Sequence, residues 1–195
     1  MVSSQDVTQV KSEIDIKNHY EILGSEFISK QQSHPLPPPG HPFIGVLFTA
    51  HWCPPCKIFL PKLIDFYTDL QIEEKPFEIV LVPMDKDPSA YNEHWSEMPW
   101  LSVPLDQTRC AMIRDKFNII GIPTLVIIDT EGRIITNKGR DHVMTHGSSA
   151  YEVWQKREVE VKEAEAKTAL WYKNFEERKR QEEAPPATEE AWGLI

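Results

Sequence analysis

The chain carries two cysteines separated by two prolines, in the stretch Trp52-Cys53-Pro54-Pro55-Cys56. A Cys-x-x-Cys pair can close a disulfide within itself, and a thiolate in such a pair attacks disulfides in other molecules. We expect Cys53 to attack a substrate disulfide, and Cys56 then to attack the Cys53 sulfur and release the reduced substrate. The pair ends oxidised, so this chemistry needs an external reductant.

Zinc binding and a structural disulfide are two other uses of a close cysteine pair. A zinc site needs four ligands, and outside the pair the sequence offers only Cys110 and scattered histidines. Three cysteines are too few for a disulfide framework and favour a reducing compartment. Redox catalysis is therefore the favoured interpretation, and we expect neither a metal nor a cofactor.

The residues around the pair predict a strand followed by a helix. Phe43 to Thr49 is an apolar run without polar alternation, which is typical of a buried central strand. Residues 54–70 predict a helix with a kink at Pro61. The residues expected on its inner side are Ile58, Phe59, Leu63, Phe66 and Leu70. Cys53 then lies at the helix N-terminus, where free backbone N–H groups and the helix dipole stabilise a thiolate.

The same placement predicts how the two thiols differ. Cys56 lies one turn inside the helix, so it should be more buried and less acidic than Cys53. Pro54 fits the first helical turn, where a missing N–H costs little. Pro55 stiffens the loop and removes a second donor, so both prolines should tune the reduction potential.

The remaining elements of the domain alternate in type. Strands are predicted at 77–84, 124–128 and 133–137, helices at 89–96 and 107–117, and an irregular segment at 98–104. This alternation predicts an α/β domain with a parallel pair of strands and an antiparallel edge.

Four segments of the chain form an ordered series of motifs. They are Phe48–Cys56, which contains Trp-Cys-Pro-Pro-Cys, then Asp85–Asp87, Met98–Pro104 and Gly121–Ile127. The series resembles the tryparedoxin and nucleoredoxin branch of the thioredoxin superfamily, over roughly residues 20 to 155. The resemblance implies a thioredoxin fold, with a central mixed β-sheet flanked by helices. It also implies a protein-disulfide reductase that uses the Cys53/Cys56 dithiol.

The resemblance further implies roles for residues beside the cysteines. Pro123 should be a cis-proline that faces them, and the backbone of Ile122 should pair with the substrate chain. Trp52 should cap the site and shield the thiolate. Trp100 could form an apolar lip with Met98 beside the nucleophile, or both could lie in the core. The expected substrate-binding set is Trp52, Pro54, Pro55, Trp100, Ile122 and Pro123.

Two positions depart from the thioredoxin pattern. Thioredoxins have a buried Asp six residues before the first cysteine, and this position is Leu47 here. The lysine that pairs with that Asp falls at about Leu81. Both charges are replaced together, so neither is left buried alone. The change leaves proton transfer from Cys56 without an obvious acid/base group, with water or Cys53 itself as candidates.

Three of five further side chains near the motifs have two interpretations each. His51 either adds positive charge when protonated or faces solvent. Lys57 is expected to be a solvated helix residue. Arg109 and Arg140 either contact an anionic substrate or carry surface charge. Cys110 is expected to be a buried, inert thiol.

The end of the chain suggests a second function. Residues 149–183 predict a long amphipathic C-terminal helix, which either lies on its own domain or binds a partner. In the alternative function, the protein is a redox-sensitive binding adaptor whose helix and tail recruit that partner. The predicted organisation is a flexible segment at 1–18, a thioredoxin-like domain at 19–155, a helical extension at 156–183 and a flexible tail at 184–195.

Composition limits the partners. A net charge of −9 argues against nucleic acid, and no apolar run approaches the ~18 residues of a membrane span. The first 14 residues lack the apolar centre of a secretory signal, which favours the cytoplasm, with the nucleus as an alternative. The expected substrates are disulfide-containing proteins such as peroxidases. The expected electron donor is a thiol reductant, such as a small dithiol or glutathione, or a flavoprotein reductase.

Overall fold

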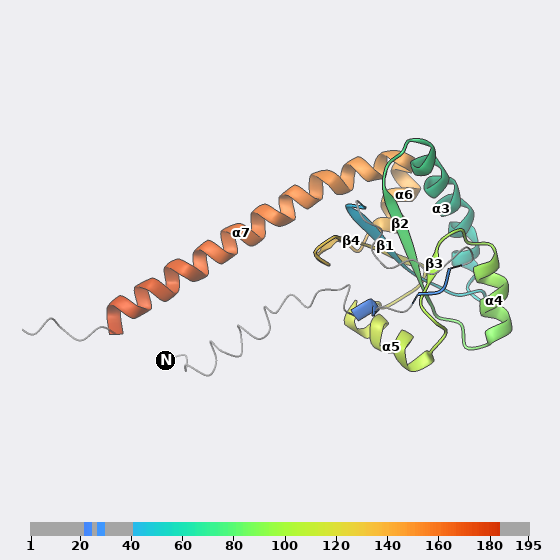
Figure 1. Ribbon diagram of the computed structural model, residues 1–195, viewed down its shortest axis with the longest axis horizontal. Coiled ribbons are helices and arrows are strands. Elements are labelled where there is room, and N and C mark those ends of the chain that lie inside the picture. Colours follow the sequence, from blue (N-terminus) through green and yellow to red (C-terminus); the bar gives the residue numbers. More distant parts are fainter. Residues whose placement is uncertain (1–21, 25–26, 30–40, 184–195) are drawn as a thin grey trace, which may run out of the picture. The chain divides into compact units, whose positions relative to one another are not determined.

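A five-stranded mixed sheet forms the centre of the computed structural model, which describes residues 22–24, 27–29 and 41–183 (Figure 1). The strands are β1 (Phe43–Thr49), β2 (Phe77–Pro83), β3 (Leu101–Ser102), β4 (Thr124–Asp129) and β5 (Ile134–Thr136). Their order is β3-β2-β1-β4-β5. β2 runs parallel to β1 and β3, and β4 runs antiparallel to β1 and β5. This arrangement confirms the predicted α/β class with its parallel pair and antiparallel edge.

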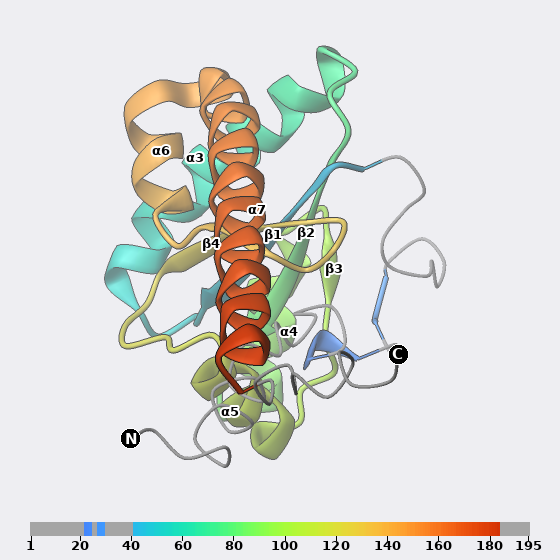
Figure 2. The same ribbon diagram turned by 90° about the vertical axis from the view of Figure 1, so that its left-hand side faces the viewer.

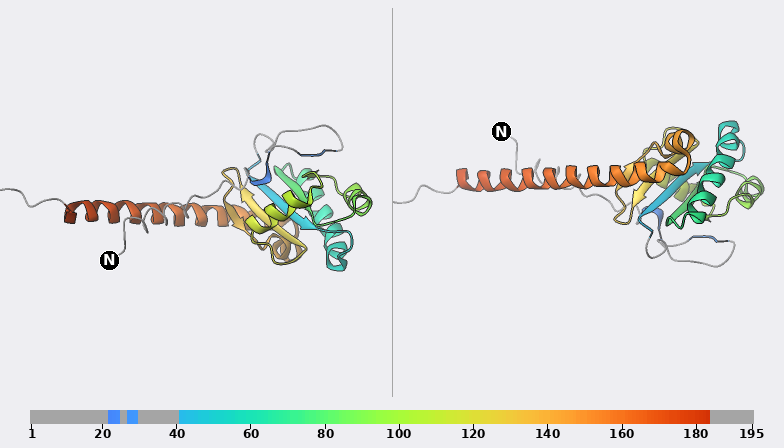
Figure 3. Two further views of the ribbon diagram at one scale, coloured as in Figure 1. Left: turned by 90° about the horizontal axis from the view of Figure 1, so that it is seen from below. Right: turned by 90° about the horizontal axis from the view of Figure 1, so that it is seen from above.

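Helices cover both faces of the sheet. They are α3 (Pro54–Ile72), α4 (Pro88–Ser96), α5 (Gln107–Lys116), α6 (Gly139–His146), the short 3-10 helix η1 (Gly147–Ser149) and α7 (Ala150–Glu183). Figure 2 shows α3 and α6 side by side, and Figure 3 gives the views from below and above. Among the described helices, none is both long and apolar enough to cross a membrane.

Alternating residues of the central strands build two cores. On one face, Phe43 and Leu47 of β1 pack with the inner side of α3 and with Trp154 from the first turns of α7. On the other face, Ile44 and Phe48 pack with residues of α5. Because successive side chains of a strand point to opposite faces, a strand buried on both faces reads as a continuous apolar run. The sheet therefore holds the carboxyl end of β1 firmly, and the cysteines follow at that end.

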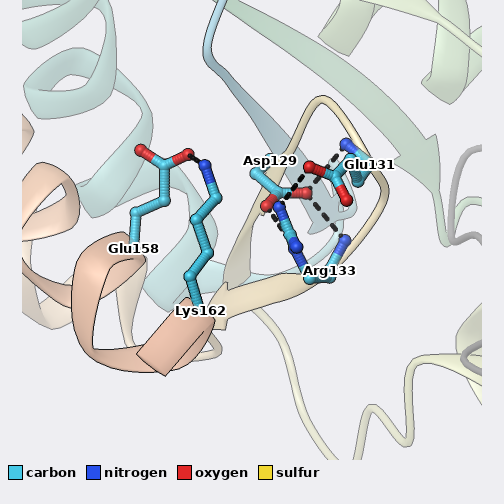
Figure 4. A network of polar contacts seen from close by, with 5 residues as sticks. All are labelled: Asp129, Glu131, Arg133, Glu158 and Lys162. Atoms are coloured by element: carbon cyan, nitrogen blue, oxygen red, sulfur yellow. Dashed lines mark hydrogen bonds and ion pairs between the residues drawn. The ribbon is translucent and has the colours of Figure 1, made fainter. Parts of the chain in front are cut away.

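A buried ion pair closes the turn between β4 and β5 (Figure 4). The carboxylate of Asp129 is fully buried and accepts hydrogen bonds from the backbone N–H of Glu131 and from the backbone and side chain of Arg133, at 2.7–2.9 Å. Arg133 also pairs with Glu131 at 2.6 Å. Figure 4 also shows Lys162 of α7 paired with Glu158, one helical turn earlier.

Two sequence predictions are corrected by the fold, and one helix was missed. The segment at 98–104 is not wholly irregular, because Leu101–Ser102 pairs with β2 as the short strand β3. The side chain of Ile58 does not lie on the inner side of α3, since it is 71% exposed and Leu60 is buried instead. The helix α6, whose buried residues are Gly139 and Val143, was not among the predicted elements.

The chain divides into two compact units inside α7, between Arg157 and Glu158. The predicted flexible segments at 1–18 and 184–195 lie outside the described residues, so the domain organisation stays a prediction.

Candidate active site

The cysteine pair lies where β1 ends and α3 begins. Cys53 is the N-cap of α3, with extended backbone (φ −95°, ψ 108°), and its carbonyl accepts the N–H groups of Cys56 (3.0 Å) and Lys57 (3.2 Å). Pro54 and Pro55 fill the first two helical positions and have no N–H. The Cys53 side chain therefore receives no capping hydrogen bond from the helix. This corrects the expectation that free N–H groups stabilise the Cys53 thiolate. Of the two expected sources of stabilisation, the helix dipole remains.

Cys56 lies behind Cys53 and is almost completely buried, with 1% of its surface exposed. Burial, together with a hydrogen bond that the Cys56 thiol donates to the Cys53 sulfur, raises the pKa of Cys56 to about 11, although a hydrogen bond from the Thr49 hydroxyl to the thiolate acts in the opposite direction. The prediction that Cys56 is more buried than Cys53 is confirmed. At neutral pH Cys56 is a thiol, and a thiol is a poor nucleophile.

The start of β4 faces the pair from the opposite side. The peptide bond between Ile122 and Pro123 is cis, as the resemblance implied. The thiol of Cys53 lies 3.8 Å from the carbonyl oxygen of Ile122 and donates a weak hydrogen bond to it. The side chains of Ile122 and Met84 pack against the small cluster that the two cysteines form with Ala50. The nucleophile therefore lies beside a backbone carbonyl and within an apolar surround.

The two tryptophans predicted for the site differ in their placement. Trp52 is 63% exposed and stands next to Cys53 in the chain. Trp100 is only 3% exposed and packs edge-on against Tyr67 in the core, and Met98 is also buried there. The proposed lip of Met98 and Trp100 is therefore corrected, and the alternative of core packing holds for both. The exposed Ile58, on the outer side of α3, was missed as a surface residue near the pair.

A polar cluster that the sequence did not reveal lies beside Cys56. The hydroxyl of Thr49 is 3.3 Å from Nε2 of His94, a residue of α4 that is 2% exposed. The backbone N–H of His51 donates to Asp85 at 2.9 Å, and the rings of His51 and His94 lie edge to face with centroids 5.9 Å apart. Burial raises the pKa of Asp85 and lowers that of His94.

His51, Lys57 and Arg109 have three different environments. His51 is half-buried and lies 3.8 Å from Glu93, so it is not a freely solvated side chain. Lys57 is exposed, as expected. Arg109 donates to the backbone carbonyl of Leu23 at 2.6 Å, a structural contact that neither interpretation foresaw.

Two further predictions concern Arg140 and Cys110. The Nε atom of Arg140, in the first turn of α6, is buried without a hydrogen-bond partner. Substrate contact and surface charge both stay predictions for this side chain. Cys110 is buried, and burial raises the pKa of its thiol, which agrees with the predicted inert cysteine.

Comparison with known proteins identifies the family. Residues 42–134 match the model of a thioredoxin-like family. Probable nucleoredoxin 1 from Arabidopsis thaliana is 38% identical over 124 residues, which cover 64% of this chain and 21% of that protein. Tryparedoxin from Trypanosoma brucei is 32% identical with a TM-score of 0.62, and the match covers 67% of this chain and 91% of that one. The chain belongs to the tryparedoxin and nucleoredoxin branch of the thioredoxin superfamily.

The matches differ in how much of each relative's length they cover. The thioredoxin-like chain spans only about a fifth (21%) of the curated plant nucleoredoxin's length. Tryparedoxin II, solved in complex with glutathionylspermidine, is 28% identical with a TM-score of 0.62, over 68% of this chain and 95% of that one. The tryparedoxin structures therefore match nearly as whole chains, whereas the nucleoredoxin matches as a part.

The two leucines that depart from the thioredoxin pattern lie side by side on neighbouring strands of this thioredoxin-like sheet. Leu47 of β1 is the register partner of Leu81 of β2, and both side chains are buried in the same core. An apolar pair therefore fills the place of the buried Asp and Lys. Replacing both charges by apolar side chains avoids an unpaired buried charge, which would cost several kcal/mol, about 3–5.

Proposed function

We propose that this domain is a thiol–disulfide oxidoreductase that reduces disulfides in other proteins. The observation that carries the proposal is the arrangement of the pair. Cys53 lies at the start of α3 and 3.8 Å from the Ile122 carbonyl, and Cys56 lies buried behind it within hydrogen-bonding reach. The relatives named nucleoredoxin and tryparedoxin support the same chemistry.

The reaction proceeds in two exchanges. The Cys53 thiolate attacks one sulfur of the substrate disulfide, and the other substrate sulfur leaves as a thiolate. Cys56 then loses its proton and attacks the Cys53 sulfur, which closes the internal disulfide and releases the second substrate thiol. Two electrons have passed from the dithiol to the substrate.

In this proposal, exposed apolar side chains and a backbone edge form the surface that binds the substrate. Trp52 and Ile58 present apolar area beside the pair, and the Ile122 backbone pairs with an extended substrate segment. Pro54 and Pro55 flank the nucleophile, and Pro123 holds the Ile122 carbonyl toward it. Trp100 is not proposed to bind the substrate, because its side chain is buried.

The partners follow from the chemistry. The substrates are disulfide-containing proteins, with peroxidases as one class. A thiol reductant returns the pair to the dithiol form, and the glutathionylspermidine bound by tryparedoxin II supports a glutathione-type donor. A flavoprotein reductase is the alternative donor. We propose the cytoplasm as the compartment, with the nucleus as the alternative, because three cysteines in this chain suit a reducing environment.

Reduction of insulin disulfides tests the proposal. With dithiothreitol as electron donor, the wild-type chain should accelerate insulin precipitation, and Cys53→Ser should return the rate to that of dithiothreitol alone. The matched control is Cys110→Ala, which removes the buried third thiol and should keep the wild-type rate. Wild-type activity surviving in Cys53→Ser would rule out the proposed role of Cys53.

A second function is favoured by the exposed face of α7. Leu170, Trp171 and Phe175 are exposed, and the rings of Trp171 and Phe175 stack with centroids 5.4 Å apart. We propose that this face recruits a protein partner, so that the domain also acts as a redox-sensitive adaptor. Pull-downs with the Trp171→Ala/Phe175→Ala variant test it. Loss of a partner that wild type retains, with insulin reduction unchanged, supports the adaptor, and identical partner sets contradict it.

A further inference from the structure

Deprotonation of Cys56 is the demanding step of the resolving exchange. In the reduced pair burial is the largest cause that raises the pKa of Cys56, and Cys56 stays buried when Cys53 is held in the mixed disulfide, so at neutral pH Cys56 carries its proton. The position that holds an acid/base carboxylate in thioredoxins is Leu47, and Leu81 lies opposite it. The proton of Cys56 therefore needs another acceptor.

Thr49 and His94 supply a hydrogen-bonded route away from Cys56. Thr49 is the last residue of β1, and its hydroxyl hydrogen bonds the Cys56 sulfur. The same hydroxyl lies 3.3 Å from Nε2 of His94. Both side chains are buried, so bulk water does not compete for these contacts at the buried sulfur.

We propose that Thr49 and His94 form a proton relay that deprotonates Cys56 during the resolving exchange. The proposal rests on the proposed function, because the exchange exists only if the pair reduces disulfides. Thr49 touches the reacting sulfur. His94 acts through Thr49 and is a positioning residue that receives the proton.

The proton balance of the step is simple. His94 starts neutral, with its proton on Nδ1 and a lone pair on Nε2. The Cys56 S–H passes its proton to the Thr49 oxygen while the Thr49 O–H passes its own to Nε2. The resulting Cys56 thiolate attacks the Cys53 sulfur, the mixed disulfide breaks, and the leaving substrate thiolate takes up a proton from solvent. The His94 imidazolium then releases its proton.

Charged groups around His94 suit this role. Burial lowers the pKa of His94, with His51 and Lys57 acting in the same direction and Asp85 opposing them. His94 is therefore neutral at neutral pH and free to accept, and the nearby Asp85 carboxylate stabilises the imidazolium that forms.

A small cavity gives the proton a way out. It has a volume of about 140 Å³, and its lining consists of His51, Lys57, Leu60, Pro61, His94 and Glu97. His51 in turn lies 3.8 Å from the exposed Glu93. The relay therefore reaches from a buried thiol to a polar cavity with titratable groups on its wall.

A two-phase reaction with the aromatic disulfide DTNB isolates the step. In a Cys110→Ala background only the pair carries thiols. Attack by Cys53 releases one thionitrobenzoate, and attack by Cys56 on the resulting mixed disulfide releases a second. The rate of the second release, followed by absorbance across pH, reports the resolving exchange alone.

The relay predicts a defined pattern in the variants. His94→Gln and Thr49→Val should slow the second release about 100-fold or more near neutral pH, as expected for loss of general-base assistance. The deficit should shrink as pH rises, because hydroxide then removes the proton of the buried thiol without the relay. Thr49→Ser, which keeps the hydroxyl, should resolve near the wild-type rate. The first release should be unchanged in all of them.

The controls separate the relay from a structural effect and from the proposed function. His146→Gln, at an exposed histidine of α6, should leave both phases unchanged. Variants that resolve at the wild-type rate, or that lose the same factor at every pH, would overturn the relay. If the unsubstituted pair also fails to release a second thionitrobenzoate at any pH, the proposed function fails and the relay is overturned with it.

Discussion

The thiol of Cys53 lies 3.8 Å from the carbonyl oxygen of Ile122, the residue before the cis-proline Pro123. This contact joins the start of α3 to the start of β4, two places 69 residues apart in the chain. In the proposed reaction, a substrate segment that pairs with the Ile122 backbone brings its disulfide to the Cys53 sulfur.

Replacement of Trp52 by alanine should weaken protein-disulfide reduction without weakening the fold. The side chain is 63% exposed, so its loss removes little packing but removes apolar area from the substrate surface. We expect kcat/KM for insulin to fall about tenfold, the loss of roughly 1.4 kcal/mol of binding, and the urea midpoint to stay unchanged. Trp171→Ala removes another exposed tryptophan, in α7, and should leave insulin reduction intact. Equal kinetics for Trp52→Ala and wild type would contradict a substrate role for Trp52.

The two thiols of the pair should differ in alkylation. Cys56 has a pKa of about 11, and the thiolate that reacts with iodoacetamide forms only as pH rises toward that value. In reduced wild-type protein at pH 7, mass spectrometry should find modification at Cys53, with Cys56 and the buried Cys110 unmodified. Modification of Cys56 should appear as pH approaches about 11. Equal labelling of Cys53 and Cys56 at pH 7 would show that the buried thiol is not protected.

Alanine at Gly139 should destabilise the fold, because a Cβ atom there would lie 2.7 Å from the carbonyl oxygen of Leu125 and 3.0 Å from its side chain. Backbone cannot move aside cheaply, so we expect a loss of about 1–3 kcal/mol in the free energy of unfolding. Gly121→Ala is the matched control, because nothing lies within 4 Å of a Cβ atom there. Urea unfolding of both variants checks the prediction, and equal stabilities would argue against close packing of α6 on β4.

Loss of the Asp129 carboxylate should also destabilise the fold. Asp129→Ala leaves the partly buried Arg133 without its buried partner and two backbone N–H groups without their acceptor. Breaking a buried pair from one side costs about 3–5 kcal/mol. Glu131→Ala removes a pairing carboxylate that is largely exposed and should cost less than about 1 kcal/mol. If thermal unfolding gave the two variants the same stability, the Asp129 interactions would not be a main support of this turn.

Local signals in the sequence predicted much of the fold and the pair itself. The unbroken apolar run at Phe43–Thr49 and the cysteine motif after it placed Cys53 at the start of α3, where the structure has it. The helices predicted at 89–96 and 107–117 are α4 and α5, and the structure adds that the side chains of Asp87 and Asp106 cap them. Such features depend on neighbours in the chain, so pattern alone reveals them.

Features that depend on tertiary contacts were missed. The approach of His94 to Thr49 joins residues 45 positions apart, and no spacing in the sequence signals it. The strand β3 exists because Leu101–Ser102 adds to the edge of β2, between Pro99 and Pro104, which limit its length. Trp100 belongs to a motif of the family, yet packing against Tyr67 decides its burial.

Capture of the mixed disulfide tests the central claim most directly. The reduced Cys56→Ser protein lacks the resolving thiol. When it is mixed with an oxidised protein substrate, it should accumulate a covalent complex that dithiothreitol separates by reducing the mixed disulfide. Peptide mapping should place the linkage at Cys53, and Cys53→Ser should form no complex. A linkage mapped to Cys110, or an equal yield of complex from Cys53→Ser, would contradict the assignment of Cys53 as the nucleophile.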